Sequence, residues 1–201
     1  MEQLELKIFH ALHVLASFLT LQLLWLFFSL GVVTIVPATV AMYAVILEWS
    51  KKGIDIMTVW RLFFPSFKRH FKDTLFLGIN LVVILGCFII YEKFIPSFFI
   101  IIFLFMISPF TFAMLPLLVT SHLKGLKLWK IAGVAAVIIL PEMLIMGGIG
   151  ITFVAIVWFY PLAIAVLASL FAFIHMNLWQ HSVKKLPQDL LDQCLLKYRY
   201  R

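Results

Sequence analysis

The chain alternates between long apolar stretches and short polar segments. The apolar stretches cover residues 12–47, 75–91, 94–120, 128–146 and 151–176. A helix needs about 20 apolar residues to cross the hydrocarbon core of a bilayer, and each stretch is near that length or longer. Since backbone N–H and C=O groups find no water inside a bilayer, we expect these stretches to be α-helices.

The first apolar stretch is too long for one membrane helix. As a single helix, residues 10–47 would extend for about 57 Å at 1.5 Å per residue, nearly twice the hydrocarbon thickness. Residues 31–37, which run from Gly31 to Pro37, are the best candidate for a break, because proline suits the start of a helix and not its interior. We therefore predict helices at about 10–30 and 33–50. The second is short, so a re-entrant or tilted half-helix remains an alternative.

The longest polar interruption, residues 48–73, has the periodicity of an amphipathic helix. Its apolar residues fall on one side at helical spacing: Val59, Leu62, Phe63, Phe67 and Phe71. Its bases fall on the other side: Arg61, Lys68, Arg69 and Lys72. We predict an interfacial helix at 58–73, bent or restarted at Pro65, lying at the level of the lipid headgroups.

The composition supports a membrane class. Apolar residues make up 64% of the 201 residues and charged residues only 12%, whereas a soluble domain carries roughly 25% charged residues. The net charge of +7 could suggest a nucleic-acid partner, but the bases lie in the segments between apolar stretches, as the positive-inside rule describes. We therefore expect no nucleic acid.

The distribution of bases predicts the orientation. Six membrane helices with the N-terminus inside place fifteen bases inside and Lys93 alone outside, whereas five helices with the N-terminus outside also move Lys7 outside. In both arrangements the tail, residues 180–201, is cytoplasmic. We predict an all-α integral membrane protein of the bacterial cytoplasmic membrane: a single domain, 1–201, with six membrane helices, or five, plus the interfacial helix. The expected membrane helices are 10–30, 33–50, 74–91, 96–120, 128–146 and 151–178.

Two segments resemble a known family. Residues 23–43, LLWLFFSLGVVTIVPATVAMY, and residues 63–75, FFPSFKRHFKDTL, are similar to signatures of the YesL-like bacterial membrane proteins. The segment at 115–118, LPLL, is a weaker likeness. Gly31 and Val36 depart from the family pattern, which has proline and glycine there. The family is multi-pass and has no known biochemical function. The resemblance implies an association with carbohydrate ABC importers and sugar-degrading enzymes, beside which such proteins are encoded in Gram-positive bacteria.

A few polar residues within the spans are candidates for function: Gln22, Asn80 and Glu142. A carboxylate in a membrane segment is costly and often functional. Glu142 follows Pro141, and the predicted topology places it near the outer end of its helix, so it serves either a polar pathway or the helix end. His10 and His13 share a face but have no third ligand nearby in sequence. We expect no metal, no cofactor and no enzyme.

Two functions remain open at this point. The first is a non-catalytic accessory subunit of a carbohydrate ABC importer, which contacts its permease or ATPase subunits. The second is a small secondary carrier with its own substrate pathway. The candidate surface for docking to a partner or to lipid is the interfacial helix, with Arg61, Phe63, Phe67, Lys68, Arg69, Phe71 and Lys72. The sequence indicates neither the sugar nor the oligomeric state.

Overall fold

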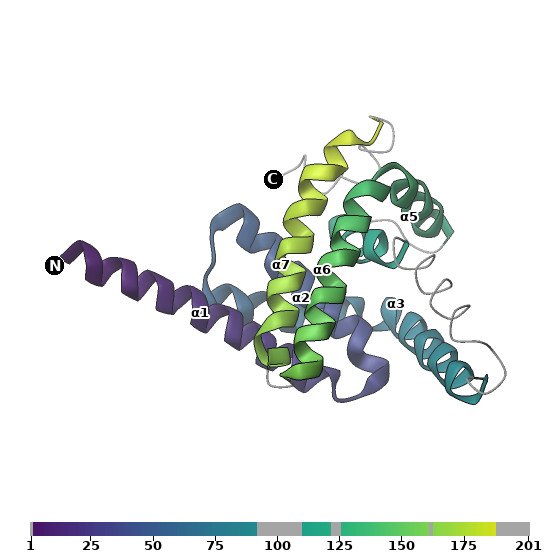
Figure 1. Ribbon diagram of the computed structural model, residues 1–201, viewed down its shortest axis with the longest axis horizontal. Coiled ribbons are helices and arrows are strands. Elements are labelled where there is room, and N and C mark those ends of the chain that lie inside the picture. The colour runs from purple at the N-terminus through teal and green to yellow at the C-terminus, as the bar shows by residue number, and fades with distance from the viewer. Residues whose placement is uncertain (1, 92–109, 122–125, 161–162, 188–201) are drawn as a thin grey trace. The chain divides into compact units, whose positions relative to one another are not determined.

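A computed structural model describes residues 2–91, 110–121, 126–160 and 163–187 (Figure 1). All regular structure in these ranges is helical, and they contain no strand. The all-α class is therefore confirmed for this part of the chain. Among the described residues, two helices are long and apolar enough to cross a membrane, Glu5–Ser29 and Leu140–Phe159.

The chain divides into two compact units, each described here by itself. Unit 1 comprises Met1–Gly78 and Ala155–Ile174, and unit 2 comprises Ile79–Val154 and His175–Arg201.

In unit 1, the first apolar stretch forms two helices. Helix α1 covers Glu2–Ser29, a 3-10 turn η1 covers Val32–Thr34, and α2 covers Ile35–Lys52 (Figure 1). The predicted break after residue 30 is confirmed. The Thr34 hydroxyl shares its hydrogen between the carbonyl of Phe28, in the last turn of α1, and that of Gly31, in the turn that follows. A Cβ at position 31 would lie 3.0 Å from Thr34 Oγ1, so glycine suits this turn.

Side-chain contacts show that α1 and α2 are antiparallel. Near the turn, Trp25 Nε1 donates to Thr39 Oγ1 at 3.1 Å. Farther from it, the Phe18 and Trp49 rings meet edge-on with centroids 5.2 Å apart. The pairing follows from the short η1 connection, because helices joined by a short turn pack side by side.

Helix α3, Ile56–Tyr91, is longer than either helix predicted for this region. It continues through Pro65 and through the expected boundary between residues 73 and 74, where the buried Thr74 hydroxyl donates to the His70 carbonyl at 2.7 Å. The separate helices at 58–73 and 74–91 are thus one. A proline removes one hydrogen bond, but the residues that follow it directly, 66–70, continue the helix.

Unit 2 contains the helix Phe110–Thr120, α5 (Leu126–Ile138), the first part of α6 (Leu140–Phe159), the end of α7 (Ile164–Ser182) and the 3-10 turn η3 (Val183–Lys185). The rest of the helix predicted at 96–120 lies outside the described residues. At 13 residues, about 20 Å, α5 is shorter than the hydrocarbon core.

The predicted break at residues 147–150 is wrong. Gly147 and Gly148 lie inside α6. The breaks fall instead at Ile139, between α5 and α6, and after Phe159, where α6 ends before α7 begins at Ile164 (Figure 1). Pro141 explains the first break, because it cannot donate the hydrogen bond that would continue α5. Glycine alone does not end a helix that is apolar on both sides, and membrane helices tolerate it.

Candidate functional site

The first part of α3 carries an aromatic row on its inner side. The Phe63 and Phe67 rings stack with centroids 6.4 Å apart, and Phe67 and Phe71 are 5.4 Å apart. Phe28 of α1 packs on this row, 5.6 Å from Phe63 and 4.7 Å from Phe67. The predicted apolar side of this segment therefore packs against α1, and Phe63 is fully buried.

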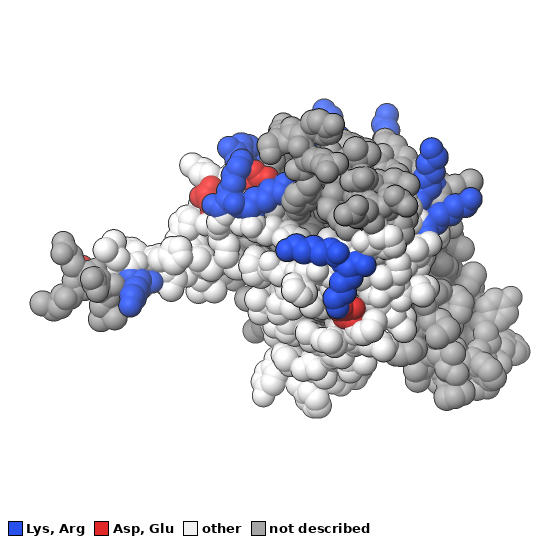
Figure 2. Space-filling view, turned by 90° about the horizontal axis from the view of Figure 1, so that it is seen from above, with Lys and Arg blue, Asp and Glu red and all other residues white. Residues whose placement is uncertain are grey.

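The predicted basic side of the same segment is exposed. Lysine and arginine side chains stand out from the surface in Figure 2, and those of α3 are Arg61, Lys68, Arg69 and Lys72, all of them exposed. Of the seven candidate docking residues, these four are at the surface, whereas Phe63 is inaccessible to a partner or to lipid. Phe67 and Phe71 are half-buried.

Three exposed apolar side chains on α3 were missed by the sequence reasoning. Met57, Trp60 and Phe64 are 72%, 51% and 40% exposed. Their i, i+3, i+7 spacing places them in one stripe on the helix surface. The signal was present in the spacing, but periodicity alone does not distinguish this second apolar stripe from the one that is buried.

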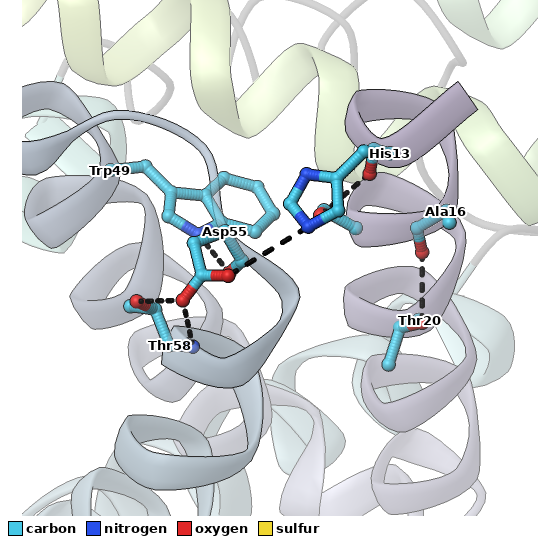
Figure 3. A network of polar contacts seen from close by, with 7 residues as sticks. His13, Ala16, Thr20, Trp49, Asp55 and Thr58 are labelled. Atoms are coloured by element: carbon cyan, nitrogen blue, oxygen red, sulfur yellow. Dashed lines mark hydrogen bonds and ion pairs between the residues drawn. The ribbon is translucent and has the colours of Figure 1, made fainter. Parts of the chain in front are cut away.

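A polar network joins the start of α3 to α1 and α2 (Figure 3). Asp55 caps α3, because its Oδ2 accepts from the Thr58 backbone N–H at 3.1 Å and from the Thr58 hydroxyl at 3.2 Å. Trp49 Nε1 donates to the Asp55 carbonyl at 3.0 Å, and His13 Nε2 lies 3.8 Å from Asp55 Oδ1. An aspartate directly before a helix is a capping signal that the sequence already contained.

The electrostatics of this network favour an ionised Asp55. Partial burial raises the pKa of the carboxyl, but hydrogen bonds from Met57 and Thr58, helped by the nearby His13, hold the pKa of Asp55 below its usual value. The network therefore caps the start of α3, and His13 lies beside the capping carboxylate of Asp55. No group of three or more His, Cys, Asp or Glu residues within the described ranges could hold a metal ion.

Gln22, a predicted intramembrane polar residue, is fully buried and bonded to α7. Its Nε2 donates to the Ile164 carbonyl at 2.9 Å, and its Oε1 accepts from the Ser169 backbone N–H at 2.7 Å. Gln22 therefore joins α1 to the first turns of α7 within unit 1.

Glu142, the predicted intramembrane carboxylate, forms an ion pair with Lys185 of η3 in unit 2. The Glu142 side chain is 11% exposed and the Lys185 side chain is 57% exposed. Glu142 was predicted near the outer end of the helix 128–146, but it lies instead in the first turn of α6, beside Lys185 of the predicted tail. Because α6 begins at Leu140, Glu142 stands in its first turn, where a negative charge is favoured by the helix dipole.

The third intramembrane candidate, Asn80, lies on α3, but its side chain is outside the described part of the structure. The structure thus separates the predicted candidates into a surface on α3, a buried link at Gln22 and an ion pair at Glu142.

Comparison with known proteins gives a family resemblance over part of the chain and no activity. Residues 18–92 match a family model described as "Protein of unknown function, DUF624". The "Uncharacterized protein YesL" of Bacillus subtilis (strain 168) is 38% identical over 65 residues. That alignment covers 31% of this chain and 31% of the relative. No solved structure matches the chain. These matches confirm the resemblance to the YesL-like family, a family of unknown function, and locate it in residues 18–92.

Proposed function

We propose that the chain is a non-catalytic, multi-pass protein of the bacterial cytoplasmic membrane that serves as an accessory subunit of a carbohydrate ABC importer. The observation that carries this proposal is that two polar side chains of the apolar helices bind other groups of the chain. Gln22 bonds to the α7 backbone and Glu142 to Lys185, so both are occupied by groups of the chain itself. Four exposed bases lie on the first part of α3, which favours a function exerted through a surface.

The membrane arrangement that we propose centres on α6 and α7. These helices, of 20 and 19 residues, are each about 30 Å long, the thickness of the hydrocarbon core. The Glu142–Lys185 pair brings the start of α6 to the end of α7, which supports an antiparallel hairpin. The tail and the bases of α5 then lie on the cytoplasmic side, in keeping with the positive-inside rule.

A carrier that works alone is less well supported. Such proteins place polar groups at a midplane site, available to the substrate. Gln22 already uses one N–H of its side-chain amide and its amide oxygen, and the Glu142 carboxylate has a lysine partner. The link to a carbohydrate importer comes from the family resemblance. The chain contains no phosphate-binding loop motif, so ATP hydrolysis belongs to another polypeptide in this proposal.

Affinity purification tests the proposal. The tagged chain is expressed at its natural level in its native host, extracted in mild detergent, and its partners are identified by mass spectrometry. We expect permease or ATPase subunits of a carbohydrate importer at near-stoichiometric amounts. A similarly tagged, unrelated multi-pass protein from the same host is the control. Recovery of the chain without importer subunits, or equal recovery with the control, contradicts the accessory role.

Transport by the purified chain tests the alternative. Proteoliposomes that contain only this protein are expected to take up no sugar above protein-free liposomes. Uptake that is lost in both Glu142→Ala and Asn80→Ala would establish a carrier and remove the proposal.

A further inference from the structure

The exposed side of α3 combines aromatic and basic side chains. Arg61, Lys68 and Lys72 lie beside the stripe of Met57, Trp60 and Phe64 when positions are advanced by about 100° per residue. All six are exposed. The segment from residue 56 to residue 72 contains no aspartate or glutamate, and the first acid of α3 is Asp73. We call this group of six residues the mixed face.

The mixed face is held in a defined shape. The Trp60 and Phe64 rings stack with centroids 6.0 Å apart and an interplanar angle of 21°. Phe64 also contacts Phe28 of α1 edge-on at 5.7 Å and Phe63 at 6.0 Å. The exposed aromatic pair is therefore fixed to the interior of unit 1, so little side-chain entropy remains to be lost on binding.

The interior does not need the mixed face. The opposite side of the helix already supplies the core, through Phe63 and Val59, both fully buried. The described part of the chain therefore leaves Met57 and Trp60 largely uncovered. Exposed apolar residues beside bases are typical of surfaces that contact a membrane or a partner.

Helix α1, in the same unit, has from residue 8 onward a largely apolar exposed surface that lacks the bases of the mixed face. The exposed large side chains of α1 include Leu15, Leu23 and Phe27, and residues 8–29 of this helix contain no lysine, arginine, aspartate or glutamate. Such a surface suits lipid hydrocarbon. The mixed face carries bases within a turn of each aromatic residue, which suits the headgroup layer, where aromatic rings and phosphate groups occur together.

We propose that the mixed face binds anionic phospholipid headgroups, with Arg61, Lys68 and Lys72 on the phosphate groups and Met57, Trp60 and Phe64 inserted among the upper acyl chains. The charges are complementary, and each base near an anionic surface contributes about 1 kcal/mol. The lipid-facing residues are thus not the predicted Phe63 and Phe67, which are part of the packing with Phe28. The proposal is independent of the accessory role.

Native mass spectrometry of the full-length protein in mild detergent tests this face. Phosphatidylglycerol and phosphatidylcholine are added in parallel, and bound lipid is counted per protein. We expect a preference for phosphatidylglycerol that weakens in high salt. The triple variant Arg61→Gln, Lys68→Gln, Lys72→Gln should lower the affinity for phosphatidylglycerol tenfold or more.

The matched control removes three exposed bases elsewhere, through Lys127→Gln, Lys130→Gln and Lys184→Gln, and should keep the wild-type preference. Equal loss in both triple variants, or no preference in the wild type, overturns the proposal.

A second measurement identifies what the face contacts in native membranes. A photoreactive phenylalanine analogue at position 64 should form adducts with phospholipid on irradiation. A protein adduct instead would assign the face to a protein partner and overturn lipid binding. Neither result depends on whether importer subunits co-purify, so this inference and the accessory role can fail separately.

Discussion

Units 1 and 2 each contain a polar residue predicted to lie within a membrane span, but they hold it in different ways. In unit 1, Gln22 is fully buried, and both of its hydrogen bonds go to backbone atoms of α7. In unit 2, the Glu142 carboxylate meets the ammonium group of Lys185, whose side chain is more than half exposed. The first contact is fixed between helices, whereas the second depends on a flexible surface cation. For both residues, a hydrogen-bond or ion-pair partner within the protein explains the polar side chain in an apolar stretch without a substrate pathway.

The packing of unit 1 should give the largest effect. Phe63→Ala removes a fully buried ring from the row that packs on Phe28, and we expect a loss of about 3–5 kcal/mol in the free energy of unfolding. Unfolding in mixed detergent and SDS, followed by circular dichroism, measures it. Phe64→Ala, at the exposed neighbouring position, should cost much less. Equal losses would mean that α3 does not bury its inner row.

The buried amide should come next. Gln22→Leu leaves the Ile164 carbonyl and the Ser169 N–H without the carboxamide, and we expect a loss of about 1–3 kcal/mol. The same unfolding titration applies. Thr20→Val is the control, because the Thr20 hydroxyl bonds only to the Ala16 carbonyl of its own helix. A Gln22 variant as stable as the control would show that the link to α7 contributes nothing.

The ion pair of unit 2 should be weaker and sensitive to salt. Since the Lys185 side chain is 57% exposed, solvent screens the pair, and we expect Lys185→Gln to cost about 1 kcal/mol or less. The difference from wild type should shrink in high salt, whereas that for Gln22→Leu should not. The neighbouring exposed lysine provides the control, Lys184→Gln. A Lys185 effect that is unchanged by salt would contradict a screened ion pair.

Removing the Asp55 cap of α3 should have the smallest effect on the free energy of unfolding, and that effect should depend on pH. The pKa of Asp55 is lowered in the folded chain, so the ionised carboxylate stabilises the fold above the unfolded pKa of about 3.9. That contribution disappears as the pH falls through the folded value. We expect the stability difference between wild type and Asp55→Asn to diminish as the pH falls from about 5 to well below the unfolded pKa of about 3.9. A difference that stays constant over this range would argue against the cap.

Local features of the sequence predicted much of the helical framework. The turn at Gly31–Thr34 followed from the length of the first apolar stretch, because no single helix fits it. The aromatic row on α3 followed from helical periodicity and is confirmed by ring contacts between Phe63, Phe67 and Phe71. Both features depend on residues close together in the chain, where spacing determines geometry.

The errors concern helix ends and distant partners. The sequence favoured a break at the glycines after residue 146, yet Pro141 ends α5 and the glycines stay helical, because a missing N–H weighs more than a missing side chain. Lys185 was not predicted as the partner of Glu142, nor was the α7 backbone as the partner of Gln22. These partners are 43 and more than 140 residues away, and no periodicity connects positions so far apart.

The Gln22 contact also has a consequence for sequence variation among relatives. The atoms that it binds are the carbonyl of Ile164 and the N–H of Ser169, which nearly every amino acid supplies. Substitutions at 164 and 169 therefore leave the contact intact, and only position 22 is constrained. An alignment should show glutamine retained at 22 with no correlated change on α7, so a search for co-varying pairs will not detect the contact.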